Sequence, residues 1–254
     1  MEFPLKIGRF LWEGKEFLGI VKEKEVTLLT NKGAEKRVEL SQVKILPPCL
    51  PTKIVGVGLN YRDHAEELGM PLPEEPLIFL KPSTAVIGHE DYILLPPESE
   101  EVHYEGELAI VMGTELYKPA SLEEAKRAIL GYTCFNDVTA RDIQRKDGQW
   151  TRAKSFNTFA PLGPFIVLDL DTSNLTIQTR VNGQTVQRSN TALMIFKPLE
   201  LVYKIAQVMT LKPGDIIATG TPPGVGPLKP GDIVEVEIEN IGILKNYVKS
   251  LQER

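Results

Sequence analysis

Apolar and polar residues alternate along residues 5–30, and Glu13-Gly14-Lys15 interrupts the alternation. Side chains on a strand point alternately to its two faces, so this pattern predicts short antiparallel strands with one buried face. A further strand is expected over Val38–Leu46. The chain therefore begins with a β-rich segment.

A cluster of prolines follows this segment. Pro47, Pro48 and Pro51 occur within five residues, and each proline pushes the residue before it towards extended backbone. We place a domain boundary there. The prediction is a small β-rich N-terminal domain of residues 1–50 and a larger domain of residues 51–254.

Strands also dominate the pattern of the second part. Asn182-Gly183 separates the runs Leu175–Val181 and Thr185–Arg188, which favours a β-hairpin. Lys-Pro-Gly-Asp occurs at 212–215 and again at 229–232 and looks like a pair of matching turns, but two unrelated turns are the favoured interpretation, because Pro, Gly and Asp are all common in turns. Further strands are expected in the apolar runs Lys53–Gly58, Leu77–Leu80, Leu108–Met112, Ile216–Thr219 and Ile233–Ile238.

Helices are few in this pattern. Ser121 and Glu124 have the spacing of a capping box, which predicts a helix over Ala125–Leu130 that ends at Gly131. Leu199–Leu211 has the best amphipathic spacing of apolar residues. The whole pattern predicts a mainly β fold with a few helices.

Composition and charge narrow the function classes. The 254 residues are 42% apolar and 25% charged, with a formal net charge of −5. A nucleic-acid binder normally presents a basic face, so we expect no nucleic-acid partner. No stretch approaches the roughly 20 apolar residues of a membrane helix, and Met1–Lys6 does not begin a signal peptide. We expect a cytoplasmic protein with no membrane association.

Ligands for soft metals are scarce. The chain has two cysteines, Cys49 and Cys134, and three histidines, and no metal-type cysteine spacing. If the protein binds a metal, carboxylates must hold it, and the ion should be hard.

Two glutamates before an apolar run are the first chemical signal. Glu105-Gly106-Glu107 leads into Leu108–Met112, and on a strand both carboxylates point the same way, roughly 7 Å apart. They repel each other unless a positive charge lies between them, and a divalent cation would supply it. The alternative is that both glutamates face solvent.

A polar segment further along the chain offers a third carboxylate. Asp137 could complete the ligand set, and a helix after it places Arg141 and Gln144 on one face. Arginine offers a bidentate fork for a substrate carboxylate. The alternative is an N-capped surface turn with an ion pair between residues four apart.

A histidine and a glutamate form the third candidate. Residues 61–68 are expected to form a short helix that ends at Gly69, with His64 and Glu67 on one face. A carboxylate bonded to an imidazole fixes its tautomer and raises its basicity, as a general base for water requires. The alternative is an ordinary surface pair.

Eight motifs then occur in one order and resemble a known family. They are G-x-N-Y-x-x-H-x-x-E, F-x-K-P-x-T, Y-E-x-E-L, N-D-x-T-A-R-D-x-Q, A-K-S-F, P-L-G-P, V-N-G and G-D-I-I-x-T-G-T-P-x-G-V-G. Together they span about Ile54 to Tyr247. The chain resembles the short branch of the fumarylacetoacetate hydrolase family.

The resemblance implies a fold, a partner and a metal. It implies a mixed β-roll, preceded here by the small N-terminal β-rich part, and a homodimer. It implies Mg²⁺ or Mn²⁺ on Glu105, Glu107 and Asp137. Residues 1–50 are too short for the N-terminal domain of the large eukaryotic fumarylacetoacetases, so fumarylacetoacetate is not the expected substrate.

The resemblance also implies residue roles. His64 and Glu67 match a water-activating dyad on a segment that in relatives is often a mobile lid, and Lys154 matches a lysine beside the metal. Substrate-contacting positions match Arg141, Gln144 and Thr221. Lys81 matches the family pattern but receives no role.

These roles suggest a substrate class. We expect a small-molecule 2-oxo acid that reacts through a metal-bound enolate, most simply by hydrolysis of a carbon–carbon bond in an acylpyruvate. Decarboxylation of oxaloacetate, tautomerisation, and isomerisation of 2-hydroxyhepta-2,4-diene-1,7-dioate share that intermediate and stay open. A hydrolyase for a sugar-derived 2-oxo acid and a non-catalytic β-rich binding module are alternatives of other classes.

Overall fold

The computed structural model describes residues 4–30 and 35–253 and consists mainly of strands. Its largest sheet has 12 strands, which include both N-terminal and later segments. Along the sheet the order is β4 (Glu35–Glu39), β3 (Glu25–Leu29), β2 (Lys15–Lys22), β1 (Lys6–Trp12), β14 (Ala160–Val167), β12 (Ile129–Asn136), β11 (Gly106–Met112), β17 (Ile216–Ala218), β6 (Lys53–Gly58) and β7 (Leu77–Pro82), with β5 (Lys44–Leu46) on β1 and β8 (Val86–Ile87) on β14.

Two smaller sheets complete the strand structure of the described residues. The first has the order β16 (Gln184–Asn190), β15 (Thr176–Val181), β19 (Ile233–Ile238), β20 (Gly242–Ser250) and β9 (Tyr92–Leu95). The second has the order β13 (Thr139–Ala140), β10 (Val102–Tyr104) and β18 (Gly226–Pro227). Leu108, Cys134 and Val167 of the large sheet pack against Ile177 and Val236 of the five-stranded sheet, so these two sheets form adjacent layers.

The helices are short. They are α1 (Arg62–Leu68), α2 (Leu122–Arg127), α3 (Arg141–Asp147), α4 (Thr151–Lys154) and α5 (Pro198–Val208), with 3₁₀ turns at η1 (Leu40–Gln42), η2 (Ser83–Ala85), η3 (Thr191–Leu193) and η4 (Leu251–Glu253). None of the helices in the described ranges is both long and apolar enough to cross a membrane.

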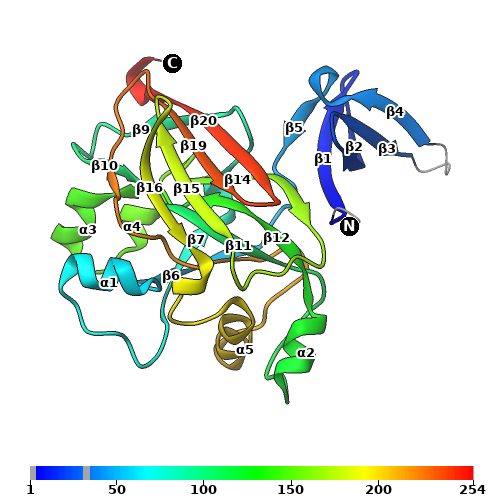
Figure 1. Cartoon of the computed structure of the whole chain (residues 1–254). Helices are drawn as coiled ribbons and strands as arrows, with labels where there is room; N and C mark the ends of the chain where they lie inside the picture. The colour runs from blue at the N-terminus through cyan, green and yellow to red at the C-terminus, as the bar shows by residue number, and fades with distance from the viewer. Residues whose placement is uncertain (1–3, 31–34, 254) are drawn as a thin grey trace.

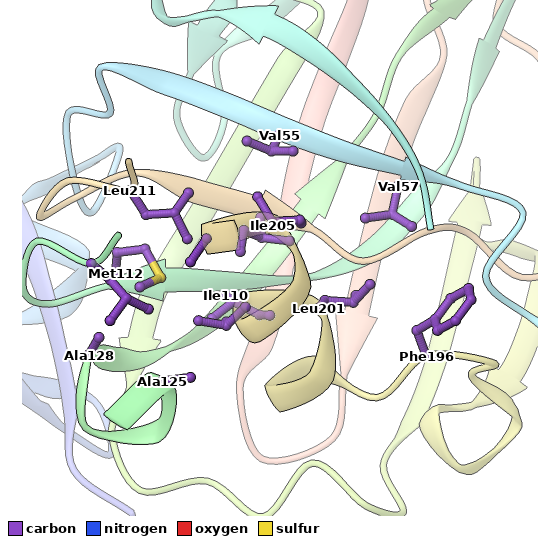
Figure 2. Close-up of a cluster of buried hydrophobic side chains, with 14 residues drawn as sticks. Val55, Val57, Ile110, Met112, Ala125, Ala128, Phe196, Leu201, Ile205 and Leu211 are labelled. Atoms are coloured by element: carbon purple, nitrogen blue, oxygen red, sulfur yellow. The ribbon is translucent and has the colours of Figure 1, made fainter. Parts of the chain in front are cut away.

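Helix α5 covers one face of the large sheet. Its buried residues Leu201 and Ile205 pack with Val55 of β6 and with Ile110 and Met112 of β11 (Figure 2). The predicted helix Leu199–Leu211 therefore exists, with bounds shifted to Pro198–Val208. Pro198 suits the first turn, where its missing N–H has no partner to lose.

The N-terminal strands lie to one side of the molecule (Figure 1). Phe10, Val21 and Leu28 form a small core, and Phe165 of β14 packs into it. The connection to the rest of the sheet is short, because only Lys6 and Ile7 of β1 pair with β14. The predicted boundary near residue 50 falls just before β6.

Two other predicted elements are divided or shortened in the structure. The strand expected over Val38–Leu46 is divided into β4 and β5 by η1. The helix expected over Ala125–Leu130 is α2, which ends at Arg127, and β12 begins at Ile129. Gly131 lies inside β12, where an added Cβ would be 2.4 Å from the carbonyl oxygen of Val167. That glycine permits close approach of β14 and does not end a helix.

Candidate active site

Strand pairing brings three carboxylates together. β11 and β12 are antiparallel, and Gly106 faces Asn136. The Asp137 N–H donates to the Glu105 carbonyl at 2.8 Å, and the Asn136 Oδ1 accepts from the Glu105 N–H at 2.9 Å. Glu105 itself lies in the break between β10 and β11 and not within a strand as predicted. One ligand oxygen each of Glu105, Glu107 and Asp137 lies within 4.8 Å of the others, and all three residues are buried.

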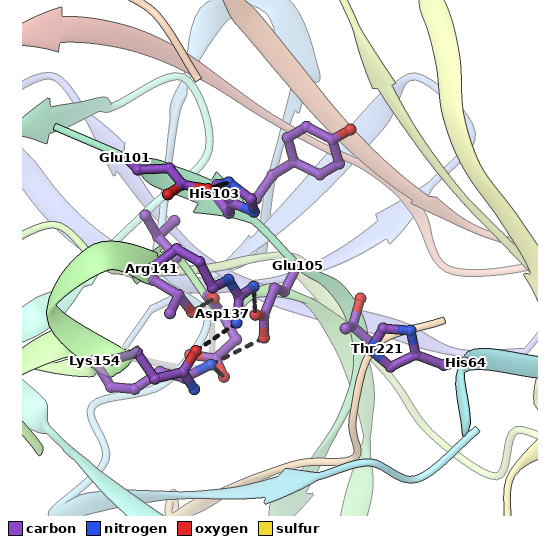
Figure 3. A network of polar contacts seen from close by, with 12 residues as sticks. His64, Glu101, His103, Glu105, Asp137, Arg141, Lys154 and Thr221 are labelled. Atoms are coloured by element: carbon purple, nitrogen blue, oxygen red, sulfur yellow. Dashed lines mark hydrogen bonds and ion pairs between the residues drawn. The ribbon is translucent and has the colours of Figure 1, made fainter. Parts of the chain in front are cut away.

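Two buried lysines and the partly buried Arg141 contact two of these carboxylates. The Lys154 ammonium donates to Asp137 at 2.6 Å and to Glu105 at 2.9 Å. The Arg141 guanidinium donates to Glu105 as well, and Lys81 donates to Asp137. Figure 3 shows Lys154 and Arg141 on one side of Glu105, with Thr221 and His64 on the other side in this view.

These neighbours shift the pKa values of Glu105 and Glu107 in opposite directions. Burial acts to raise the pKa of Glu105, but the charges of Lys154 and Arg141 outweigh it and lower this pKa to about 2. Burial raises the pKa of Glu107 well above its ordinary value, and the Asp137 and Glu105 carboxylates add to the effect. Lys154 acts to lower the pKa of Glu107 as well, but it does not offset the burial of this residue, because its ammonium is paired with Glu105 and Asp137.

The residues fit a divalent cation. Three buried carboxylates with convergent oxygens are the donors that hard ions such as Mg²⁺ and Mn²⁺ prefer. A cation at this position would offset the burial of Glu107. The structure thus places the predicted metal ligands together, while the identity of the ion stays a prediction.

The predicted neighbours Arg141 and Gln144 are also in contact. The Arg141 Nη1 donates to the Gln144 Oε1 at 2.6 Å, one turn along α3. The predicted helix after Asp137 is confirmed by α3. Guanidinium has five N–H donors, so bonds to Gln144 and Glu105 leave others available for a ligand carboxylate.

The His64–Glu67 pair lies on α1. The His64 Nδ1 is 2.8 Å from the Glu67 Oε2, and the helix ends at Gly69 as predicted. The ring is largely buried, whereas the Glu67 side chain is 43% exposed. His64 thus lies mainly inside the protein, whereas Glu67 is accessible to solvent.

The loop 219–224 connects this pair with the carboxylates. The Gly220 N–H donates to the Glu107 Oε2 at 2.8 Å, and the Gly224 N–H donates to the Glu67 Oε1 at 3.2 Å. The Thr221 hydroxyl donates to the Gly106 carbonyl at 2.9 Å. Thr221 therefore lies beside the ligands, with its hydroxyl hydrogen already used.

Sequence reasoning missed several residues that hold this site. Lys81 was visible in the F-x-K-P-x-T motif, and the structure places its ammonium on Asp137 and on the Val138 carbonyl at 3.0 Å. Asn136 was visible beside Asp137. Gln187 gave no signal, because an amide in a polar hairpin strand has no distinctive spacing.

Comparisons with known proteins point to one family. A family model described as "Fumarylacetoacetate (FAA) hydrolase C-terminal" matches residues 53–249. The chain belongs to the fumarylacetoacetate hydrolase family. The mainly β fold with few helices is the fold of solved members of this family.

Several members of the fumarylacetoacetate hydrolase family are similar over nearly the whole chain. An uncharacterized protein from Archaeoglobus fulgidus is 60% identical over 240 residues, 94% of each chain. A mitochondrial oxaloacetate tautomerase from Bos taurus is 43% identical over 258 residues, 96% of this chain and 80% of the relative. The solved structure of 5-carboxymethyl-2-hydroxymuconate delta-isomerase from Mycobacterium smegmatis has a TM-score of 0.89 at 46% identity, covering 96% of this chain and 98% of that chain. The chain is an enzyme of this family.

Proposed function

We propose that this enzyme transfers a proton on a 2-oxo acid and so interconverts its keto and enol forms, with a divalent cation on Glu105, Glu107 and Asp137. The observation that carries the proposal is the convergence of three buried carboxylates beside the fixed Lys154 ammonium. The names of similar proteins, a tautomerase and a delta-isomerase, favour proton transfer over hydrolysis as the first reaction to test.

Arg141 and Lys154 provide positive charge for the substrate. A bound Mg²⁺ or Mn²⁺ would act as a Lewis acid towards the 2-oxo oxygen of the substrate. The free N–H donors of Arg141 would bind the substrate carboxylate, as a planar fork suits that group. The Lys154 ammonium would offset the negative charge that develops when a proton leaves the carbon beside the 2-oxo group.

The His64–Glu67 pair is the candidate base. With the Nδ1 proton donated to Glu67, the Nε2 of His64 carries the lone pair. In the proposed reaction Nε2 takes a proton from the carbon beside the 2-oxo group, the C–H electron pair forms a C=C bond to C2, and the π pair of the C=O bond moves to the 2-oxo oxygen. Return of a proton to that oxygen gives the enol, and the reverse path gives the ketone.

Hydrolysis of an acylpyruvate is the second candidate, and the same pair is the observation that favours it. A histidine oriented by a carboxylate suits deprotonation of water. The resulting hydroxide would attack the distal carbonyl, the bond between that carbonyl and C3 would break, and pyruvate would leave as its enol. The first candidate differs from hydrolysis because it transfers a proton and involves no attack of hydroxide on the distal carbonyl.

A substrate screen tests the proposal. The purified protein would be mixed with oxaloacetate, acetylpyruvate, fumarylpyruvate and 2-hydroxyhepta-2,4-diene-1,7-dioate, each with Mg²⁺, with Mn²⁺ and with EDTA. We expect metal-dependent loss of enol absorbance with no new carboxylic acid from bond cleavage. Appearance of pyruvate and a second acid would favour hydrolysis, and release of CO₂ from oxaloacetate would indicate decarboxylation. No metal-dependent turnover of any of them would contradict the metal-enzyme proposal.

A further inference from the structure

A buried glutamine in the five-stranded sheet touches the strand that carries the candidate ligands. Gln187 of β16 is 1% exposed. Its Oε1 accepts a hydrogen bond of 3.1 Å from the Gly106 N–H. That N–H belongs to the peptide between Glu105 and Gly106, so the glutamine holds the backbone between the two candidate glutamate ligands.

The other end of the same side chain holds the loop 219–224. Its Nε2 donates to the Thr221 hydroxyl at 2.9 Å and to the Pro222 carbonyl at 2.8 Å. An amide offers one oxygen acceptor and one NH₂ with two donors, and both N–H groups have an acceptor here. A carboxylate or an aliphatic side chain cannot make this set of bonds.

The loop 219–224 in turn contacts both the candidate ligand Glu107 and the candidate dyad residue Glu67. The Gly220 N–H bonds to Glu107, and the Gly224 N–H bonds to Glu67. A shift of the loop relative to Gly106 therefore moves the donor on a candidate metal ligand and the donor on the candidate dyad at once. Two side chains bridge Gly106 and this loop. The Thr221 hydroxyl bonds to the Gly106 carbonyl, and Gln187 connects the Gly106 N–H to Thr221 and Pro222.

We propose that Gln187 is a positioning residue, which fixes the ligand strand and the loop 219–224 in one geometry so that Glu105 and Glu107 bind the cation together. It reaches the reaction only through these neighbours. The inference rests on the proposed metal site and is independent of the choice of substrate. Groups that orient metal ligands in this way typically contribute about 10–100-fold to metal affinity or activity.

The main test is the Mn²⁺ affinity of Gln187→Met, which keeps the length of the side chain and removes its polar atoms. We expect Mn²⁺ to bind about 10–100-fold more weakly than to the unmodified protein, measured by titration with the electron paramagnetic resonance signal of free Mn²⁺. Gln178→Met is the matched control. Gln178 of the neighbouring strand β15 donates to Glu237 at 2.8 Å, and its loss should leave Mn²⁺ affinity unchanged.

A second variant keeps the test valid if Gln187→Met folds poorly. Thr221→Val removes the hydroxyl that accepts from Gln187, together with the bond of this hydroxyl to the Gly106 carbonyl, and it should also weaken Mn²⁺ binding. The losses of the two single variants should be less than additive in the double variant, because both loosen the same connection between Gly106 and the loop 219–224.

The possible outcomes separate the two proposals. Unchanged Mn²⁺ affinity in Gln187→Met or in Thr221→Val, or full additivity between them, would overturn the positioning role. Failure of the unmodified protein to bind Mn²⁺ would instead overturn the metal site on which the proposed function depends.

Discussion

Glu107 differs from the other carboxylates of the site in its partners. Glu105 and Asp137 both bond to the Lys154 ammonium, whereas Glu107 accepts from the backbone N–H of Gly220. Its raised pKa follows from burial next to like charges. A cation in the site would therefore matter most to this residue.

Glu107→Gln tests that residue directly. We expect turnover to fall by at least about 100-fold with saturating metal, because the variant removes a ligand charge. The fold should remain, since glutamine has the same shape and its oxygen can still accept from Gly220. Steady-state rates and thermal melting would be measured beside Glu75→Gln, which alters an exposed ion pair with Lys204 and should behave like the unmodified protein. Full activity of Glu107→Gln without metal would contradict the assignment.

Gly106 between the two glutamates is required by packing. An added Cβ would lie 2.2 Å from the Thr179 Oγ1 and 3.3 Å from Val236. No side chain fits there unless Thr179 or its strand β15 moves, so the small residue allows the two sheets to meet directly behind the candidate ligands.

This packing predicts a rescue. Gly106→Ala should lower the free energy of unfolding by about 1–3 kcal/mol through overpacking. Thr179→Ala removes the atom in the way, and the double variant should regain most of the loss. Urea unfolding of the four proteins would measure this coupling. Equal losses from Gly106→Ala with and without Thr179 would show that the clash is not the cause.

The ligand residues were predictable from the sequence because their chemistry is unusual and their motifs are ordered. Glu105, Glu107 and Asp137 lie next to apolar strands, where a charged side chain is unusual unless it has a partner or a function. Gln187 was not predictable, because its role arises from the packing of two sheets far apart in sequence. The catalytic roles of His64 and Lys154 rest on the proposed function.

At the level of elements, the two Lys-Pro-Gly-Asp turns have the same local bond. The Asp215 carboxylate accepts from the Lys212 N–H at 2.9 Å, and the Asp232 carboxylate accepts from the Lys229 N–H at 2.7 Å. Only Asp215 is fully buried, and it also accepts from Thr52 and Lys53 at the start of β6. The two turns share this local bond, but only the first turn is bonded to a strand of the large sheet.

This difference predicts unequal effects on stability. Burial opposes ionisation of Asp215, but bonds from Lys53, Thr52 and Lys212 lower its pKa below the usual 3.8. A lowered folded-state pKa adds stability above the unfolded pKa, and this stability is lost as pH falls through the folded value. Asp215→Asn should therefore cost about 1–3 kcal/mol at neutral pH and flatten the loss of stability below about pH 4.

Asp232→Asn is the matched control for that variant. Its carboxylate lies near the surface, so the substitution should cost less than about 1 kcal/mol. Urea unfolding at neutral pH and at several acid pH values would compare the two. Equal costs would show that the bonds to β6 contribute nothing.

Elements with a simple apolar pattern were predicted best. Lys53–Gly58 and Ile233–Ile238 have the bounds that the sequence indicated. β14 was missed because Pro161 and Pro164 argue against a strand, yet pairing with β12 and β1 holds it in the sheet. Tertiary pairing overrode local preference there.

On the scale of the whole molecule, the N-terminal strands extend the same sheet that carries the candidate ligands. β14 lies between β1 and β12 in that sheet. Residue 50 is thus the proposed boundary in the sequence, but the large sheet continues across it because β1 pairs with β14.

The assembly of the molecule is the remaining prediction. The family resemblance implies a homodimer, and exposed leucines are present, such as Leu18 at 60% and Leu50 at 68%. Light scattering should give a mass about twice 28.3 kDa. A mass of one chain at micromolar concentration would contradict this expectation.

The antiparallel register of β11 and β12 has a consequence for sequence change in this enzyme. Glu107 faces Phe135, and the connection between the two strands runs outward through α2. Leu116, Ala125 and Ala128 of that connection are buried in the core cluster that includes α5, so insertions leave the pairing and this packing intact only at its exposed positions. A single residue inserted between Glu107 and Met112 would turn alternate side chains to the opposite face and separate Glu107 from Asp137. Inserted residues should therefore be tolerated at exposed positions of the connection and should abolish activity within the strand.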